Sequence, residues 1–266
     1  MNIDIFLRKI IKILGIESLY EKMLNEEVKE GPLPKHIAVI MDGNRRWANE
    51  RNLPAWEGYR YGADIAEKFV LWCLDYNIKI ITFYALSKDN LLKRSPEELH
   101  AIVENIYEKL KKLEESGLIE NRKIRIKTLG NKELLPDALK RKLEELESST
   151  KNNDGMIINV AVAYSGRYEI LNAVKEIAVE VKNGKISPED INEEFFMSKL
   201  YTGDLPYPEP DLIIRTSGEM RLSDFLLYQS SYSEMIFIDI YWPDVRKIDF
   251  LRMIRTYEKR NRRFGK

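Results

Sequence analysis

The chain has little of several residue types. Its 266 residues include one cysteine, Cys73, and two histidines, His36 and His100. A single cysteine cannot form an internal disulfide, which favours a reducing compartment, and the apolar helical run around Cys73 predicts a small buried hydrophobe. So few histidines and cysteines make a zinc site or a histidine-based triad hard to assemble. Chemistry is therefore expected from carboxylates, arginines and amides.

A net charge and a long apolar run are also absent. Lys+Arg and Asp+Glu number 43 each, so no overall field attracts nucleic acid, and any anion site must be a local cluster. No run approaches the roughly 20 apolar residues that a membrane span requires, and the N-terminus has no signal-peptide layout. These features predict a cytoplasmic protein that does not bind nucleic acid.

Two segments are distinguished by composition. Residues 1–30 form an expected N-terminal arm whose residues 3–14 interleave apolar and basic side chains, as in an amphipathic helix. Such an arm could make peripheral contact with a membrane, or dock on its own domain or on a partner subunit. A charged linker containing glycine and proline follows, so one globular domain is expected over residues 31–266.

Strand and helix patterns alternate through this domain. Alternation of this kind predicts the α/β class, with a central, mostly parallel sheet of about six strands covered by helices on both faces. Strands are expected at 36–41, 78–86, 124–129, 156–164, 212–215 and 235–240. Helices are expected at 62–76, 95–117, 136–150, 168–181, 193–201 and 248–263.

The first candidate site follows the first predicted strand. Asp42 comes directly after an apolar run, and Gly43-Asn44-Arg45-Arg46 then turns toward a helix. Backbone N–H groups at such a turn, with Arg46, suit phosphate oxygens, and a neighbouring aspartate indicates a bridging magnesium ion. Taken alone, the tripeptide 42–44 is better explained by Asp42 as a helix cap beside solvated arginines.

A second cluster follows the strand at 212–215. Arg215, Arg221 and Ser223 surround a Ser-Gly turn, and two guanidinium groups with a hydroxyl suit bidentate capture of a diphosphate. An arginine at the end of a buried strand needs an anionic partner. An ion pair from Arg215 to Glu219 or Asp211 is the competing interpretation.

Two further polar sets lie next to strands. The Ser87-Lys-Asp-Asn90 stretch follows the strand at 78–86 and either joins the sheet edge of Asp42 or forms a turn before a helix capped by Ser95. Glu234 precedes the last strand and either supplies a second carboxylate to a metal or caps that strand.

Several motifs together carry a resemblance to one family. They are MDGNRRWA at 41–48, YALSKDN at 84–90, NVAVAYSGRYEI at 159–170, DLIIRTSGEMRLSDFLLYQ at 211–229 and SEMIF at 233–237. In order and in spacing, from about residue 34 to residue 265, the chain resembles the cis-prenyltransferases, the undecaprenyl diphosphate synthase family.

The resemblance implies an enzyme with Mg²⁺ as cofactor. Such an enzyme condenses isopentenyl diphosphate repeatedly onto an allylic diphosphate primer, and the long polycis-polyprenyl diphosphate is a precursor of glycosyl carrier lipid. Ionising an allylic diphosphate requires neutralisation of the leaving group, which magnesium and arginine supply, and a dry apolar tunnel must shelter the cation. Helix faces at 62–76 and 95–116 are expected to line that tunnel.

The resemblance also implies residue roles. Asp42 would hold magnesium and the primer diphosphate, and Glu234 would be a further magnesium ligand. Asn90 would lie beside the reacting carbons, where a neutral amide is expected to orient the substrate and not to act as a base. The other implied substrate-binding residues are Gly43, Asn44, Arg45, Arg46 and Trp47 for the primer, Arg215, Arg221 and Ser223 for isopentenyl diphosphate, and Ser87, Asp89, Leu91 and Arg94 beside them.

The chain departs from the family pattern at three positions. Tyr59 replaces the histidine of a Gly-His-x-x-Gly segment, so any phosphate contact of that histidine is lost or is taken over by Tyr59 or Arg60. Ala55 replaces an arginine of many bacterial members, and Leu91 replaces an aromatic residue after the asparagine. These differences concern primer affinity and primer choice more than reaction type.

Other features resemble archaeal and eukaryotic members. The Asn-Arg-Arg-Trp sequence and the arm imply, by this resemblance, a longer primer such as geranylgeranyl diphosphate, and farnesyl diphosphate stays open as the alternative. The closing Arg263-Phe-Gly265 resembles a motif that reaches the active site across the family's dimer, which implies a homodimer with residues 225–232 in its interface. A non-catalytic partner subunit is the alternative function. It is disfavoured because the chain retains the polar set Asp42, Arg46, Asn90, Arg215, Arg221 and Glu234.

Overall fold

The computed structural model describes residues 16–260. Within that range the chain forms two compact units, one made of residues 16–34 with 245–260 and the other of Lys35–Asp244. The amphipathic pattern at residues 3–14 and the Arg263–Gly265 motif lie outside the described residues. The expected domain boundary at residue 30 stays a prediction.

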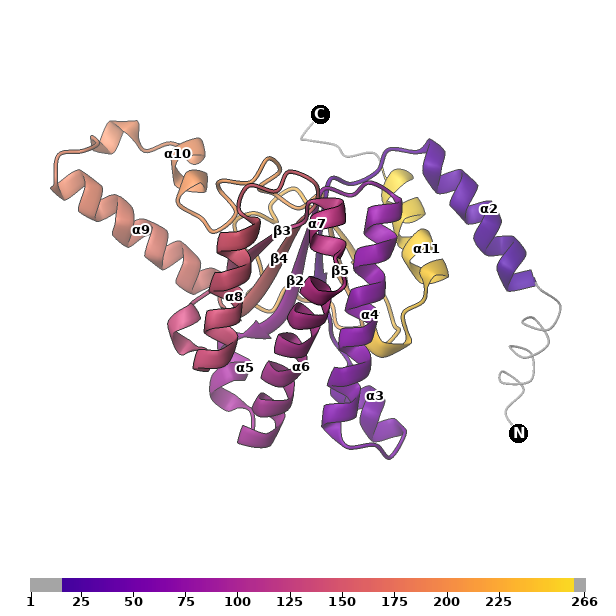
Figure 1. The fold of residues 1–266 in the computed structure, drawn as a ribbon. Coiled ribbons are helices and arrows are strands. Elements are labelled where there is room, and N and C mark those ends of the chain that lie inside the picture. Colours follow the sequence, from indigo (N-terminus) through magenta and orange to yellow (C-terminus); the bar gives the residue numbers. More distant parts are fainter. Residues whose placement is uncertain (1–15, 261–266) are drawn as a thin grey trace. The chain divides into compact units, whose positions relative to one another are not determined.

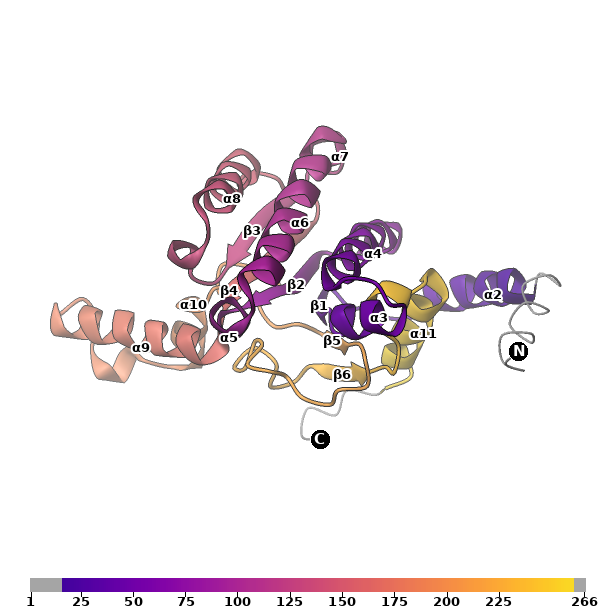
Figure 2. The same ribbon diagram turned by 90° about the horizontal axis from the view of Figure 1, so that it is seen from below.

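The larger unit is built on a six-stranded sheet in which every neighbouring pair is parallel, with the order β3-β4-β2-β1-β5-β6 (Figures 1 and 2; all six strands are labelled in Figure 2). Residues of β1, β4 and β5 are buried at every position, as expected for strands covered on both faces. The predicted α/β class and the parallel sheet are therefore confirmed. The strands are β1 (His36–Ile40), β2 (Ile80–Ser87), β3 (Arg125–Leu129), β4 (Ile157–Tyr164), β5 (Leu212–Arg215) and β6 (Glu234–Phe237).

One face of the sheet is covered by α4 (Ala55–Asp75), α6 (Pro96–Glu115) and α8 (Asp137–Thr150), as Figures 1 and 2 show. Ser95 caps α6 by accepting a hydrogen bond from the Glu98 backbone N–H at 3.3 Å, as predicted. The remaining helices of this unit are α3 (Asn44–Glu50), α5 (Lys88–Lys93), α7 (Leu118–Arg122), α9 (Gly166–Lys182) and α10 (Glu193–Ser198), with short 3₁₀ turns η1 (Lys132–Leu134), η2 (Pro188–Asp190) and η3 (Trp242–Asp244).

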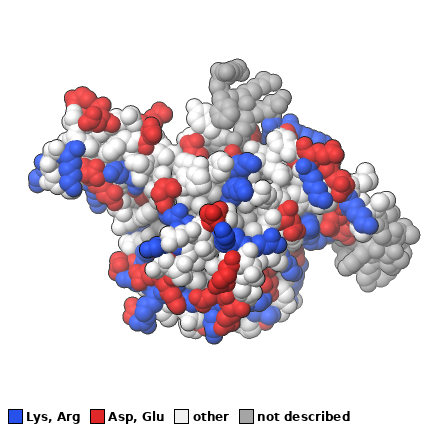
Figure 3. All heavy atoms as spheres, turned by 45° about the horizontal axis from the view of Figure 1, so that its top comes forward, with Lys and Arg blue, Asp and Glu red and all other residues white. Residues whose placement is uncertain are grey.

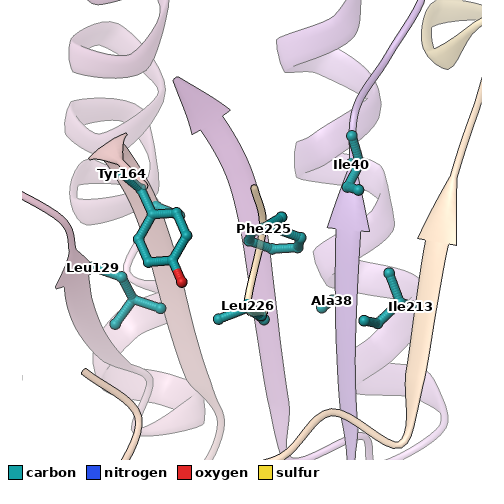
Figure 4. Packing of buried hydrophobic residues seen from close by; sticks show 8 residues of the cluster. Ala38, Ile40, Leu129, Tyr164, Ile213, Phe225 and Leu226 are labelled. Atoms are coloured by element: carbon teal, nitrogen blue, oxygen red, sulfur yellow. The ribbon is translucent and has the colours of Figure 1, made fainter. Parts of the chain in front are cut away.

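The opposite face is covered by the segment that follows β5. Phe225 and Leu226 are fully buried and pack with Ala38, Ile40 and other residues of the strands (Figure 4). The Phe225 ring stacks on Tyr84 with centroids 4.5 Å apart. These two residues belong to the core of their own chain, which corrects the expectation that they lie in a dimer interface.

Among the elements that differ from the predicted pattern are α4, α5 and β6. Helix α4 begins seven residues before residue 62, and its first turns carry glycines and exposed Trp56 in place of an apolar stripe. The stretch after Ser87 is a helix, α5, whose first turn Ser87 caps. Strand β6 ends at Phe237, because the carbonyls of Ile238 and Ile240 accept hydrogen bonds from the turn at residues 217–218.

The smaller unit pairs α2 (Ile16–Glu30) with α11 (Lys247–Glu258). Val28 on α2 and Ile254 on α11 are fully buried. Arg255 Nη1 lies 3.6 Å from Glu27 Oε2 at its edge. The described part of the N-terminal arm therefore packs on the last helix of the same chain.

No helix within residues 16–260 combines the length and the apolar character that crossing a bilayer would require.

Candidate active site

The site begins at the carboxyl end of β1, where Asp42 and Arg215 form an ion pair. The register pairs Ile40 with Arg215, so the neighbouring ends of β1 and β5 bring the two side chains together. Arg215 Nη2 donates to Asp42 Oδ2 at 2.8 Å, and Arg46 Nη2 lies 3.5 Å from Asp42 Oδ1. Burial opposes ionisation of Asp42, but Arg215 and Arg46 outweigh it and lower the pKa of the carboxyl below its usual value. Asp42 is therefore a carboxylate at neutral pH.

The turn after Asp42 requires a glycine. Gly43 has φ 99°, and an added Cβ would lie 2.6 Å from the Tyr241 ring. Its N–H donates to Asp42 Oδ1 at 2.7 Å, and no side chain caps α3. The interpretation of Asp42 as a helix cap is thus wrong.

Helix α3 is held by two glycines of α4. A Cβ on Gly58 would lie 2.1 Å from the Asn44 carbonyl oxygen, and a Cβ on Gly62 would lie 2.1 Å from Asn44 Oδ1. The Asn44 carbonyl belongs to the backbone and cannot give way, so only glycine fits at position 58, whereas a side chain at position 62 would displace the Asn44 amide. The two helices thereby fix the position of the Gly43–Arg46 turn.

Arg215 is the most buried charge at the site, with 4% of its side chain exposed. Its Nη1 donates to Ser223 Oγ at 2.7 Å and to the carbonyl of Arg221, and its Nε has no hydrogen-bond partner among the described residues. A buried donor of this kind is costly unless a ligand satisfies it. The ion-pair partner of Arg215 is Asp42, through Nη2. The predicted ion pairs of Arg215 with Glu219 and with Asp211 are therefore both wrong.

The two acidic residues considered for Arg215 have other partners. Asp211 Oδ2 accepts hydrogen bonds from the backbone N–H groups of Lys35 and His36, at 2.6 Å and 3.0 Å. Glu219 pairs with Arg221 and, at 3.4 Å, with Arg46. Glu219 thus connects Arg46 of the first polar cluster with Arg221 of the second.

Residues after β2 form the other wall. Ser87 Oγ accepts from the Asn90 backbone N–H at 3.0 Å, and both residues line the cavity. Asp89 is exposed and pairs with Lys93 at 2.6 Å. Arg94 donates to the hydroxyl of Tyr59, a buried residue of α4 that lines the same cavity.

One cavity of about 1370 Å³ joins these groups to an apolar channel. It extends between α4 and α6 over β2 and β4, so the predicted lining by these two helix faces is confirmed. The predicted site residues that line it are Asp42, Gly43, Asn44, Arg45, Arg46, Ser87, Asp89, Asn90, Arg94, Arg215, Arg221 and Ser223. Its apolar walls include Ala63, Ala66, Val70, Leu71, Phe83, Ile102, Ile106, Leu110, Leu113 and Val160.

Three predicted site residues do not line this cavity. Trp47 is buried, and its Nε1 donates to Asp244 Oδ1 at 2.7 Å, so it holds α3 from behind. Leu91 lies on α5 outside the lining. Glu234 begins β6 in register with Leu212 and Ile37, five residues before Asp42, or roughly 16 Å along a strand. Within one chain Glu234 is at the far end of the sheet from Asp42.

Sequence reasoning missed two hydroxyl groups that join the motifs. Asp42 N–H donates to Thr216 Oγ1 at 2.9 Å, and Thr216 Oγ1 donates to the Asp42 carbonyl at 2.6 Å. Arg46 Nη2 donates to Ser217 Oγ at 2.6 Å. The Thr-Ser-Gly sequence after β5 was the available signal, because hydroxyls at a strand end can bond a neighbouring turn.

The electrostatics agree with a local anion site. Basic and acidic side chains are interspersed over the face in Figure 3, whereas Arg46, Arg215 and Arg221 converge at the cavity. Three arginines around the Asp42 carboxylate, at the polar end of an apolar channel, suit an amphiphile with a diphosphate head group. Fold and site therefore fit an α/β enzyme that acts on an amphiphilic diphosphate.

Comparison with known proteins identifies the family. Residues 40–265 match the family model described as "Putative undecaprenyl diphosphate synthase". A tritrans,polycis-undecaprenyl-diphosphate synthase (geranylgeranyl-diphosphate specific) of Methanopyrus kandleri is 49% identical, covering 96% of this chain and 93% of the relative. Its counterpart from Pyrococcus abyssi is 46% identical, with 93% of each chain covered.

Two solved structures of related proteins have a similar fold. Lavandulyl diphosphate synthase from Lavandula x intermedia, in complex with dimethylallyl diphosphate, has a TM-score of 0.84 and 34% identity over 90% of this chain and all of that one. A Campylobacter jejuni protein described as "a probable undecaprenyl diphosphate synthase" has a TM-score of 0.70 and 32% identity, over 88% of this chain and 99% of that one. The chain belongs to the cis-prenyltransferases, the undecaprenyl diphosphate synthase family, and is a transferase of prenyl groups.

Proposed function

We propose that this enzyme adds isopentenyl diphosphate units repeatedly to geranylgeranyl diphosphate, and less readily to farnesyl diphosphate, to form a long polycis-polyprenyl diphosphate. The observation that carries the proposal is the single cavity in which the Asp42–Arg215 cluster opens into the channel between α4 and α6. Archaeal relatives named as geranylgeranyl-specific support the longer primer. The product would serve as precursor of a glycosyl carrier lipid.

In this proposal the primer diphosphate lies against the Gly43–Arg46 turn. Asn44 and Arg45 begin α3 and line the cavity, and the Arg46 guanidinium lies next to Asp42. The hydrocarbon tail of the primer then follows the apolar channel. This placement puts the allylic carbon near the boundary between the polar cluster and the channel.

Isopentenyl diphosphate would bind on the β5 side. Arg215 Nε is buried without a partner, Ser223 Oγ lies 2.7 Å from Arg215 Nη1, and Arg221 is largely exposed above them. A diphosphate there satisfies the free guanidinium donors of Arg215 and Arg221. The isopentenyl double bond then faces the allylic carbon.

The reaction breaks the allylic C–O bond, and the diphosphate leaves with the electron pair. The isopentenyl double bond attacks the allylic carbon, forming one C–C bond, and a proton is lost from the isopentenyl unit. Arg46 and Arg215 stabilise the negative charge that develops on the leaving group. Asn90 orients the isopentenyl unit, and a phosphate oxygen accepts its proton, because a neutral amide is a poor base.

Magnesium fits the donor set as a substrate-bridged ion. Residues 16–260 contain no group of three or more side chains suited to hold a metal, whereas Mg²⁺ commonly uses one or two carboxylates and completes its shell with phosphate oxygens and water. Asp42 is the carboxylate in place for it. When bound, magnesium would neutralise diphosphate charge. Glu234 can serve as a second ligand only if another copy of the chain supplies it.

The proposal includes a homodimer with peripheral contact to the cytoplasmic face of a membrane. Leu171, Val174 and Val179 on α9 have about half of their surface exposed, which supports contact with a second subunit through this helix. The alternation of apolar and basic residues at positions 3–14 supports peripheral membrane contact.

The test is incorporation of radiolabelled isopentenyl diphosphate into butanol-extractable lipid, with magnesium and with geranyl, farnesyl or geranylgeranyl diphosphate offered separately. Elongation should be fastest with geranylgeranyl diphosphate. Asp42→Asn should reduce it by about 100-fold or more, whereas Asp154→Asn, a change at an exposed carboxylate outside the cavity lining, should leave it unchanged.

Absence of incorporation with every primer, from a folded protein, would contradict the proposal and favour the non-catalytic partner subunit. A preference for geranyl diphosphate would contradict the assignment of the longer primer.

A further inference from the structure

The channel between α4 and α6 has a charged side as well as apolar walls. Glu67 of α4 and Lys109 and Lys112 of α6 line the cavity among the apolar residues of the same two helices. A hydrocarbon chain has no use for charged groups as binding partners. The role of these three side chains is therefore sought in their contacts with one another and not in binding the hydrocarbon chain.

The charges form one network between the two helices. Lys109 Nζ donates to Asp64 Oδ1 at 2.5 Å and to Glu67 Oε2 at 2.8 Å, and Lys112 Nζ donates to Glu67 Oε1 at 3.0 Å. We call Asp64, Glu67, Lys109 and Lys112 the α4–α6 clasp. Each helix contributes two residues, so every hydrogen bond in the clasp joins one helix to the other.

The clasp is held more firmly than an isolated surface pair. Lys109 is 25% exposed and contacts two carboxylates at once, and Glu67 contacts two ammonium groups. Burial alone would lower the pKa of Lys109, yet Asp64 and Glu67 raise it above its usual value, so the ammonium stays charged. A network of this kind can restrain two helices where a single exposed pair would contribute little.

We propose that the α4–α6 clasp is a determinant of product length, because it fixes the separation of the two helices that enclose the growing chain. This inference rests on the proposed function. Each cycle lengthens an apolar chain by one isopentenyl unit inside a channel of limited volume. When the helices cannot separate, growth stops once the channel is filled. Release of the clasp should let the helices part and allow further cycles.

The experiment compares product ladders at a fixed ratio of isopentenyl diphosphate to primer. Lys109→Met removes the ammonium that contacts both acidic residues, and we expect its ladder to shift by one or more isopentenyl units toward longer products. Lys109→Glu should lengthen the products in the same way. Exchange of all four charges, Asp64→Lys/Glu67→Lys/Lys109→Glu/Lys112→Glu, restores an opposite-charge pair at every contact of the clasp and should return the ladder toward that of the wild type.

A matched control removes another ion pair of α6, one that lies outside the cavity lining. Lys142 of α8 pairs with Glu114 of α6 at 2.5 Å, and neither residue lines the cavity. Lys142→Met should leave the ladder of the wild type unchanged.

Two results would overturn the proposal: a Lys109→Met ladder that is unchanged or shorter, or an equal shift in Lys142→Met. Absence of incorporation by the wild type would instead refute the proposed function, because the clasp affects only the length of products that are made.

Discussion

Among single residues, Tyr59 stands where many family members have a histidine, and its contacts show which residue near that position supports the site. Its hydroxyl accepts a hydrogen bond from Arg94 Nη1, and the Arg94 guanidinium lies 5.2 Å from its ring centroid. Burial is the main cause that raises the pKa of Tyr59, so the hydroxyl stays protonated. Arg60, by contrast, is exposed and pairs with Glu57 at 2.6 Å. Tyr59, and not Arg60, is the residue positioned to hold a site arginine.

Tyr59→Phe should therefore raise the KM for the primer by about tenfold, with little change in kcat, because a partly buried guanidinium loses a hydrogen-bond acceptor worth about 1.5 kcal/mol. Tyr59→His should recover part of the loss. Steady-state kinetics with varied primer measures both variants, and Arg60→Gln serves as the neighbouring control. Equal KM values for Tyr59→Phe and wild type would show that Arg94 needs no support from this hydroxyl.

His36 gives a prediction about stability. The ring is completely buried, with Nδ1 2.9 Å from the Tyr207 carbonyl and Nε2 2.7 Å from Thr82 Oγ1. Burial lowers its pKa from 6.5 to about 4. Between these values the unfolded chain binds a proton that the folded chain does not, so stability falls as the pH decreases through this window.

The expected loss from this histidine between pH 7 and pH 5 is about 2 kcal/mol. Urea unfolding at both pH values measures it, and His36→Asn should show a pH dependence smaller by that amount. Equal pH dependences in the two proteins would mean that His36 titrates normally in the folded state.

At the scale of elements, the approach of α4 to α3 controls the Gly43–Arg46 turn. Gly62→Ala would place a Cβ 2.1 Å from Asn44 Oδ1 and 3.0 Å from the Trp242 ring. We expect a destabilisation of about 1–3 kcal/mol from overpacking, and a lower kcat/KM for the primer because the side chain of Asn44, which lines the site, must shift.

Gly184→Ala is the control for this change. Gly184 has φ 65° and no atom within 4 Å of an added Cβ, so the substitution should cost about 1 kcal/mol through the backbone alone and leave kcat/KM unaltered. Thermal unfolding and primer kinetics on both variants separate the two effects. An unchanged kcat/KM in Gly62→Ala would mean that the turn does not depend on this helix contact.

The elements that sequence reasoning predicted well are those with a strong period or a cap. All six strands and the start of α6 were predicted, because the buried runs of β1, β4 and β5 and the Ser95 cap are local signals. The first turns of α4 and the end of β6 were not. Their limits depend on contacts with Asn44 and with the turn at residues 217–218, which are distant in sequence.

The site residues differ in the same way in how far the sequence predicts their positions. The polar residues after β1 and β5 were correctly predicted to lie together, because adjacent parallel strands end at one edge of the sheet. Glu234 was grouped with them although it starts its strand, and the strand direction alone would have placed it at the opposite edge. Trp47 was placed at the substrate on family pattern alone, and its actual contact with Asp244 is 197 residues away in sequence.

For the whole molecule, fold stability and metal binding should be separable. Residues 16–260 contain no cluster of three or more metal-ligating side chains, and Asp42 is already neutralised by Arg215 and Arg46 without an ion. A chelator alone should therefore leave Tm unchanged while it abolishes elongation.

Magnesium with geranylgeranyl diphosphate, in the absence of isopentenyl diphosphate, should raise Tm. At a primer concentration of 100 Kd, binding adds about 2.7 kcal/mol to the free energy of unfolding, which corresponds to roughly 5–10 °C for a chain of this size. The shift should shrink in the presence of chelator and in Asp42→Asn, because both lose the link between the carboxylate and the diphosphate. Differential scanning calorimetry on the full chain measures Tm with chelator alone, with primer and magnesium, with primer and chelator, and for Asp42→Asn with primer and magnesium. Each Tm is compared with that of the same protein without additions. A fall in Tm on chelation without primer would reveal a structural metal, and an equal shift with and without magnesium would show that the arginines alone hold the primer.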